Sequence, residues 1–224
     1  PFVSKATGVP LPYMATQVML GKTLDELDPW SMRRGGFTCV KEAVLPFQRF
    51  PGVDIILGPE MHSTGEVMGM GSDFPEAYYK SQLASGQDLP QGGNVFISVN
   101  DRDKPILPEV AAMFADLGFH LLATRGTARY LRERGLEVEE VLKVYEGRPN
   151  IVDRMINGAL VINTASGKNT ARDSKSIRHT AVSYGVPYCT TVAGAKASAI
   201  AIRKRREDTH VESLQEYYAR EARG

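Results

Sequence analysis

The 224-residue sequence predicts an α/β fold whose C-terminal part is a doubly wound, mainly parallel sheet of five strands. Two observations favour this class. Short apolar runs alternate with stretches of helical periodicity, and their spacing suits right-handed crossovers between parallel strands. The expected strands span residues 92–99, 119–123, 138–144, 159–163 and 186–191, with a helix that starts near Pro105 and a last sheet helix at about 193–203.

Residues 1–85 mix helical and strand patterns and predict a separate α+β segment. Helices are expected at 12–20, at 23–27 and at 73–84, the last with Asp73 as its N-cap, and a strand is expected at 37–45. Residues 86–91 form a polar segment that contains a glycine and a proline, which is typical of a linker. The predicted division is therefore 1–85, 86–91 and 92–224, with a closing helix at 211–220 that turns Leu214, Tyr217 and Tyr218 inwards.

The composition excludes several classes of partner. The formal net charge is +1, so no broad basic field favours a nucleic acid or a membrane surface. Cys39 and Cys189 are far apart and fit no metal or redox spacing, and the four histidines show no ligand spacing, so no metal site is predicted. Reduced thiols and the lack of a long apolar run or signal peptide favour a cytoplasmic protein.

A candidate anion site lies where the second predicted strand meets a helix. The sequence F-H-L-L-A-T-R-G-T at residues 119–127 is an apolar run that ends in hydroxyl residues and a glycine. Free amide groups of a helix's first turn attract anions, and Gly126 allows close approach while Thr124 and Thr127 offer hydroxyl groups. The alternative is a plain strand-to-helix turn in which Thr127 is the N-cap.

A second junction of this kind favours the ligand-binding interpretation. The apolar run 159–163 opens into T-A-S-G-K-N at 164–169, before a helical pattern that starts at Asp173. Lys104 and Lys143 follow two other predicted strands and are suited to a phosphate. Carboxyl ends of parallel strands meet at one edge, where open α/β sheets bind ligands, so we expect a small phosphorylated ligand there.

Three segments carry a resemblance to a known family: residues 1–10 (PFVSKATGVP), 40–47 (VKEAVLPF) and 57–69 (LGPEMHSTGEVMG). They resemble the large chain of carbamoyl-phosphate synthases, and the resemblance extends over essentially the whole chain. It implies that residues 1–85 are the tail of the second ATP-grasp unit and that residues 92–224 form a methylglyoxal-synthase-like regulatory domain. The chain opens on Pro1 rather than methionine, so we expect it to be part of a longer protein.

The resemblance implies a site for the nucleotide monophosphates UMP, an inhibitor, and IMP, a weaker activator. Thr124, Gly126, Thr127 and Lys104 would hold the phosphate. The full set of implied positions is Ser98, Lys104, Thr124, Gly126, Thr127, Lys143, Asn163, Thr164, Ser166, Asp173 and Ile177, of which Asn163, Asp173 and Ile177 would line the ribose and base. Ala165 departs from a threonine that some bacterial members carry, which bears on affinity and on the preference between the two nucleotides.

Glu42 and Thr190 match family positions that touch the activator ornithine. A carboxylate suits the ammonium group of this ligand, and a threonine suits its carboxylate. Because part of that site would come from residues upstream of Pro1, we expect weak or absent ornithine binding by this chain alone.

As part of an intact enzyme, the chain is expected to serve a ligase that makes carbamoyl phosphate from glutamine, bicarbonate and two ATP for the arginine and pyrimidine pathways. Such an enzyme needs ATP, magnesium or manganese, and potassium. The expected partners are the remainder of the large chain and the glutaminase small subunit, with an oligomer through the allosteric domain as a further candidate. In the family the last metal-binding residues precede the segment that begins at Pro1, so this part is predicted to be inactive alone and to hold no cofactor.

Two other functions stay open. A methylglyoxal synthase shares the fold and cleaves dihydroxyacetone phosphate, with a carboxylate as general base. Here Gly147-Arg148-Pro149-Asn150 stands where that family reads Gly-Gly-Asp, which places Pro149 at the catalytic position, and the active-site histidine is replaced near Thr170. A pure interaction domain, which neither binds nucleotides nor turns them over, is the other alternative.

Overall fold

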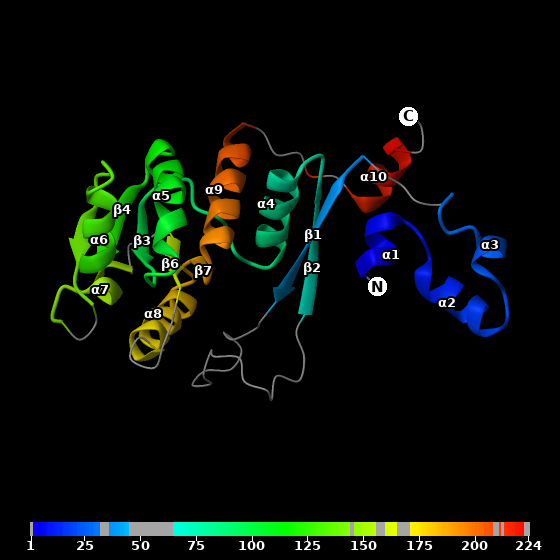
Figure 1. Cartoon of the computed structure of the whole chain (residues 1–224). Coiled ribbons are helices and arrows are strands. Elements are labelled where there is room, and N and C mark those ends of the chain that lie inside the picture. The colour runs from blue at the N-terminus through cyan, green and yellow to red at the C-terminus, as the bar shows by residue number, and fades with distance from the viewer. Residues whose placement is uncertain are drawn as a thin grey trace.

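The computed structural model describes residues 2–31, 36–44, 65–143, 146–155, 160–164, 171–207, 211 and 213–221, without the side chains of 171–173, 175, 218 and 220–221. The elements form an extended arrangement, with a parallel sheet and its helices at one end and three short N-terminal helices at the other (Figure 1). Helix α4 (Phe74–Ala84) lies between these two parts. Within the described residues, no helix is long and apolar enough to cross a membrane.

The predicted fold class is confirmed by a five-stranded parallel sheet. Its strands are β3 (Asn94–Ser98), β4 (His120–Thr124), β5 (Glu139–Val141), β6 (Leu160–Asn163) and β7 (Tyr188–Cys189), in the spatial order β5-β4-β3-β6-β7. The outer strands are shorter than predicted. They lie at the two edges of the sheet, where each has a strand partner on one side only.

The alternation of side chains along the strands explains why helices cover both faces. Val95, Ile97 and Leu121 point into one core, while Phe96, Leu122 and Val161 point into the other. The first core packs on α5 (Leu107–Asp116), α6 (Arg125–Arg132) and α9 (Val192–Glu207), and the second on α7 (Ile151–Met155) and α8 (Ala171–Ser183). A 3-10 turn, η2 (Lys104–Ile106), precedes α5 and contains Pro105 as expected.

The strand order reverses between β3 and β6. From β3 the chain proceeds to β4 on one side, and β6 pairs with β3 on the other. The loops that leave these two strands diverge to opposite sides, which opens a crevice at their carboxyl ends. The predicted junction at 119–127 leads into this crevice, and so does Thr164, the first residue of the second junction, whose residues 165–169 lie outside the described residues.

The N-terminal part contains a second, smaller sheet. Strand β1 (Thr38–Val44) pairs antiparallel with β2 (Gly65–Gly71), and α4 packs against both. Asp73 caps α4 as predicted, because its carboxylate accepts a hydrogen bond from the Glu76 amide at 2.9 Å. Strand β2 was not predicted, because its glycines interrupt the strand pattern in the sequence. These glycines allow α4 to pack closely: a Cβ atom at Gly69 would lie 1.9 Å from the Ala77 carbonyl oxygen.

Four short helices complete the N-terminal end: α1 (Phe2–Thr7), α2 (Leu11–Met19), α3 (Leu24–Leu27) and α10 (Leu214–Glu221). Helix α1 was not predicted; the other three begin or end within a few residues of the predicted bounds. Tyr217 is buried and makes an edge contact with Phe37, at 5.4 Å between ring centroids. Leu214 is half-buried, and the side chain of Tyr218 lies outside the described set.

Helix α9 extends four residues past its predicted end because its last turn has partners. Arg205 donates to the Asp88 carboxylate at 2.7 Å and to the Leu89 carbonyl at 2.6 Å, and Arg206 donates to the Leu117 carbonyl at 2.8 Å. Two arginines of the cationic run at residues 203–206 therefore bind the protein's own chain, including the segment predicted as a linker. The division at residues 85 and 91 itself stays a prediction.

Candidate functional site

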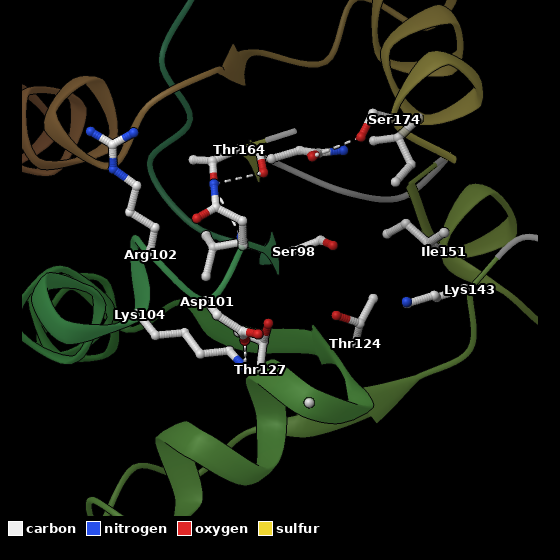
Figure 2. Close-up of a pocket in the computed structure, with 15 residues that line it drawn as sticks. Ser98, Asp101, Arg102, Lys104, Thr124, Thr127, Lys143, Ile151, Thr164 and Ser174 are labelled. Carbon is white, nitrogen blue, oxygen red and sulfur yellow. Dashed lines mark hydrogen bonds and ion pairs between the residues drawn. The ribbon is translucent and has the colours of Figure 1, made fainter. Parts of the chain in front are cut away.

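A cavity of about 470 Å³ opens at the carboxyl ends of β3, β4 and β6 (Figure 2). It brings together every predicted effector-site residue whose side chain is described: Ser98, Lys104, Thr124, Gly126, Thr127, Lys143, Asn163, Thr164 and Ile177. Ser166 and the side chain of Asp173 lie outside the described set. We call this cavity the switch-point pocket.

The start of α6 forms the floor of the switch-point pocket. The helix begins at Arg125, so Thr124 occupies the N-cap position and Thr127 lies in the first turn. The alternative in which Thr127 caps the helix is therefore wrong. The Thr124 side chain makes no capping hydrogen bond and points into the pocket (Figure 2), which leaves its hydroxyl group and the first-turn amides directed at a ligand.

Two lysines flank this helix start from opposite sides (Figure 2). Lys104 comes from η2, and its side chain is only 19% exposed, with Nζ 5.8 Å from the centre of the Tyr130 ring. A Cβ atom on Gly126 would lie 3.8 Å from the same Nζ. Lys143 approaches from the segment that follows β5. The cations and the helix dipole together favour an anion.

The opposite wall of the switch-point pocket offers polar groups and a buried donor. Asn163, at the end of β6, is 3% exposed; its Oδ1 accepts a hydrogen bond from the Ser174 hydroxyl at 3.4 Å. Its Nδ2 is buried and has no acceptor among the described residues. A buried amide donor without a partner is costly, and a ligand oxygen would satisfy it. Ile151 and Ile177 add an apolar surface.

Sequence reasoning missed Asn100, which ties two of the loops together. Its amide and its Nδ2 both donate to the Thr164 hydroxyl, at 3.2 and 3.1 Å, and its Nδ2 also donates to the Asp103 carboxylate at 2.7 Å. The hydroxyl of Thr164 therefore holds the loop after β3. An asparagine directly after a strand, three residues before an aspartate, is a turn signal that could have indicated this role.

Glu42 and Thr190 also come together, in a second cavity of about 150 Å³ between β1, α4, β7 and α9. We call it the α4–α9 pocket. The Gln82 amide donates to the Glu42 carboxylate at 3.0 Å, and burial raises the pKa of this carboxyl above its ordinary value. Burial also raises the pKa of Tyr78 to about 12 and that of the Cys189 thiol to about 11, so both stay neutral near pH 7. Glu42 is thus the one charged side chain among the lining residues.

Comparisons with known proteins relate the chain to one group of enzymes. A family model described as MGS-like domain matches residues 107–190. A carbamoyl phosphate synthase large chain from Nostoc sp. is 52% identical over 220 residues, which cover 97% of this chain and 20% of that protein. C-terminal sections of such large chains from Aquifex aeolicus and Methanopyrus kandleri are 48% and 50% identical, and cover 97% and 92% of this chain and 45% and 40% of those proteins.

Among solved structures, a methylglyoxal synthase from Elizabethkingia anophelis aligns with a TM-score of 0.42 and 18% identity, covering 58% of this chain and 92% of that one. The chain spans about a fifth of the length of the full-length large chains it matches. It spans less than half of the C-terminal sections.

Proposed function

Because this chain is homologous over almost its whole length to carbamoyl phosphate synthase large chains and corresponds to their C-terminal part, we propose that it is the regulatory part of a glutamine-dependent carbamoyl phosphate synthase. The whole enzyme would make carbamoyl phosphate for arginine and pyrimidine synthesis, and this part would sense products. An effector can shift the enzyme only by binding its two states with different affinity.

The switch-point pocket carries the proposal that the effectors are nucleotide monophosphates, UMP and IMP. Its floor combines the amides of α6, the Thr124 hydroxyl and the Lys104 ammonium, a set suited to a phosphate. Its opposite wall offers the unpaired Asn163 amide and apolar isoleucines, which suit a ribose and a base. A volume of about 470 Å³ is within the range of small-molecule sites.

The α4–α9 pocket supports a contribution to an ornithine site. Glu42 would pair with a ligand ammonium, and Thr190 would bind its carboxylate. The pocket of about 150 Å³ is small for this ligand. The remaining contacts would come from the rest of the large chain.

The N-terminal helices favour the remainder of the large chain as a partner. Met19, Leu20 and Trp30 are 85%, 75% and 75% exposed. Exposed apolar groups of this size are typical of surfaces that another part of a protein covers. Catalysis would depend on that remainder too, and we propose that this chain is inactive alone.

The structure offers no support for the lyase alternative. Pro149 is exposed and does not line the switch-point pocket. Among the described residues that line it, Asp101 is the one carboxylate, and it is paired with Lys104. A general base would have to be free to take a proton from the substrate.

Calorimetric titration of the 224-residue chain with UMP and with IMP, in phosphate-free buffer, tests the proposal. We expect saturable binding that a Thr124→Ala, Lys143→Ala double variant weakens by about 30-fold or more, since charged hydrogen bonds to the phosphate are lost. Lys196→Met is the matched control, because Lys196 pairs with Glu109 on the helix surface. Absence of binding at millimolar nucleotide, or equal losses in the control, would contradict the proposed site.

A further inference from the structure

The principal cation of the switch-point pocket already has an anionic partner. The Asp101 carboxylate lies 2.6 Å from the Lys104 ammonium, and Figure 2 shows it directed toward the start of α6. The Lys104 side chain is mostly buried, at 19% exposure, whereas that of Asp101 is 91% exposed. The hydrogen bond from Lys104 lowers the pKa of Asp101, so the carboxylate is charged at neutral pH. A negative charge thus stands at the place proposed for a phosphate.

The loop that carries Asp101 is anchored by its backbone and by neighbouring side chains, not by the Asp101 carboxylate. Asn100 is bound to Thr164, and Asp103 is bound to Asn100 through both its amide (3.1 Å) and its carboxylate (2.7 Å). The Asp101 side chain extends from this fixed turn into solvent. It can therefore leave Lys104 by rotation of its own side chain, without a movement of the backbone.

Lys104 is much less able to leave. Its side chain is mostly buried, and its ammonium lies beside Gly126 and 5.8 Å from the centre of the Tyr130 ring. An arriving phosphate would therefore meet a fixed cation and a mobile carboxylate that compete for the same contact. Two anions on one ammonium repel each other, so the carboxylate must yield.

We propose that the Asp101 carboxylate competes with phosphate ligands for the Lys104 ammonium; this inference rests on the proposed function. Asp101 thereby lowers the affinity of the switch-point pocket for such ligands and sets the ligand concentration at which the pocket fills. Because the carboxylate is exposed to solvent, its ion pair with Lys104 is weak enough to be displaced. It still has to be broken each time the ligand binds. An anion that pairs poorly with Lys104 gains nothing from displacing the carboxylate.

The test measures binding of UMP and of inorganic phosphate to the full chain and to Asp101→Asn, at low ionic strength where exposed charges are least screened. Asp101→Asn keeps the shape of the side chain and removes its charge. We expect it to bind both ligands about three- to tenfold more tightly. Asp101→Glu, which keeps the charge, should stay near the wild-type affinity. Asp116→Asn, an exposed aspartate on α5, controls for the change in net charge.

The site of action is tested by removing the cation as well. In an Asp101→Asn, Lys104→Met variant the gain in affinity from Asp101→Asn should vanish, because the ammonium for which the carboxylate and the phosphate compete is gone. Thermal unfolding of each variant checks that the fold is kept. An affinity that is unchanged or lower in Asp101→Asn would overturn the inference, since the carboxylate would then only orient Lys104 or do nothing.

The outcomes also separate this inference from the proposed function. Equal UMP binding by wild type and Asp101→Asn overturns the inference and leaves the nucleotide proposal intact. Tighter inorganic phosphate binding by Asp101→Asn, without UMP binding by any variant, supports the inference and overturns the nucleotide proposal. No binding of either anion to any variant overturns both.

Discussion

The two pockets of this chain differ in the sign of their charge and in how that charge is produced. The switch-point pocket gathers lysines and free amides at a helix start, and its surface stays open to solvent around Asp101. The α4–α9 pocket is smaller, and Glu42 is the one carboxylate among the described residues that line it. If the proposed functions hold, one fold carries an anion site built at a helix start and a cation site built between β1, α4 and α9.

The largest expected effect is a loss of stability at Gly69, where α4 packs against β2. It should disturb the α4–α9 pocket and not the switch-point pocket. Gly69→Ala would place a Cβ atom 1.9 Å from the Ala77 carbonyl oxygen and 2.4 Å from the Ser81 amide nitrogen, so α4 must move. We expect a loss of about 3 kcal/mol in the free energy of unfolding, as overpacking of backbone against backbone costs at least as much as overpacking a core. The α4–α9 pocket should be distorted, while UMP affinity in the switch-point pocket should change little. Chemical denaturation and calorimetry measure both.

Gly65→Ala is the matched control for that substitution. It lies on the same strand, and its Cβ atom would be 3.4 Å from the Val44 Cβ atom, which is ordinary contact. The two variants should differ by about 2 kcal/mol or more in stability. Equal stabilities would mean that α4 does not depend on the close approach at Gly69.

A smaller effect is expected on ligand affinity in the switch-point pocket, with the stability of the fold preserved. Gly126→Ala adds a methyl group at the start of α6, within 3.8 Å of the Lys104 ammonium but without a clash. Alanine favours a helix, so stability should be unchanged or rise by about 0.5 kcal/mol. The methyl group would nevertheless occupy space that the phosphate needs, and we expect about a tenfold loss of UMP affinity by calorimetry.

Gly92→Ala controls for the general effect of replacing a glycine, since nothing lies within 4 Å of its Cβ position. It should leave nucleotide affinity at the wild-type value. If Gly126→Ala bound UMP as tightly as the control, the phosphate would not approach the first turn of α6.

The contrast between the pockets also shows what the sequence can predict. The switch-point pocket follows from local signals, because strand ends and helix starts leave marks such as Thr124 and Gly126, and parallel strands bring them to one edge. Asn100 and Asp101 escaped notice because their roles depend on Thr164 and Lys104 across loops. In the α4–α9 pocket, Tyr78, Gln82 and Ser198 come from helices far apart in the chain. Glu42 and Thr190 were found there by family resemblance and not by pattern.

The smallest expected effect concerns the charge of the α4–α9 pocket. Burial raises the pKa of Glu42, so its stabilising contribution is fully present below the ordinary value of 4.5 and is lost as pH rises through the raised pKa. Glu42→Gln keeps an oxygen that can accept from Gln82 and removes the charge. At pH 7 the variant should be more stable than wild type by no more than about 0.5 kcal/mol, since solvent reaches half of this carboxylate, and the difference should vanish near pH 4.

Glu66→Gln on the neighbouring strand supplies the opposite case. The hydrogen bond from Lys41 lowers the pKa of Glu66, so its stabilising contribution exists above 4.5 and is lost as pH falls through the lowered pKa. Denaturation curves from about pH 2 to pH 8 should therefore show the Glu66 variant falling behind wild type as pH rises to about 4.5, and the Glu42 variant gaining on wild type as pH rises above 4.5. A Glu42 variant whose stability relative to wild type did not change between pH 4 and pH 8 would mean that Glu42 is solvated like a surface carboxylate.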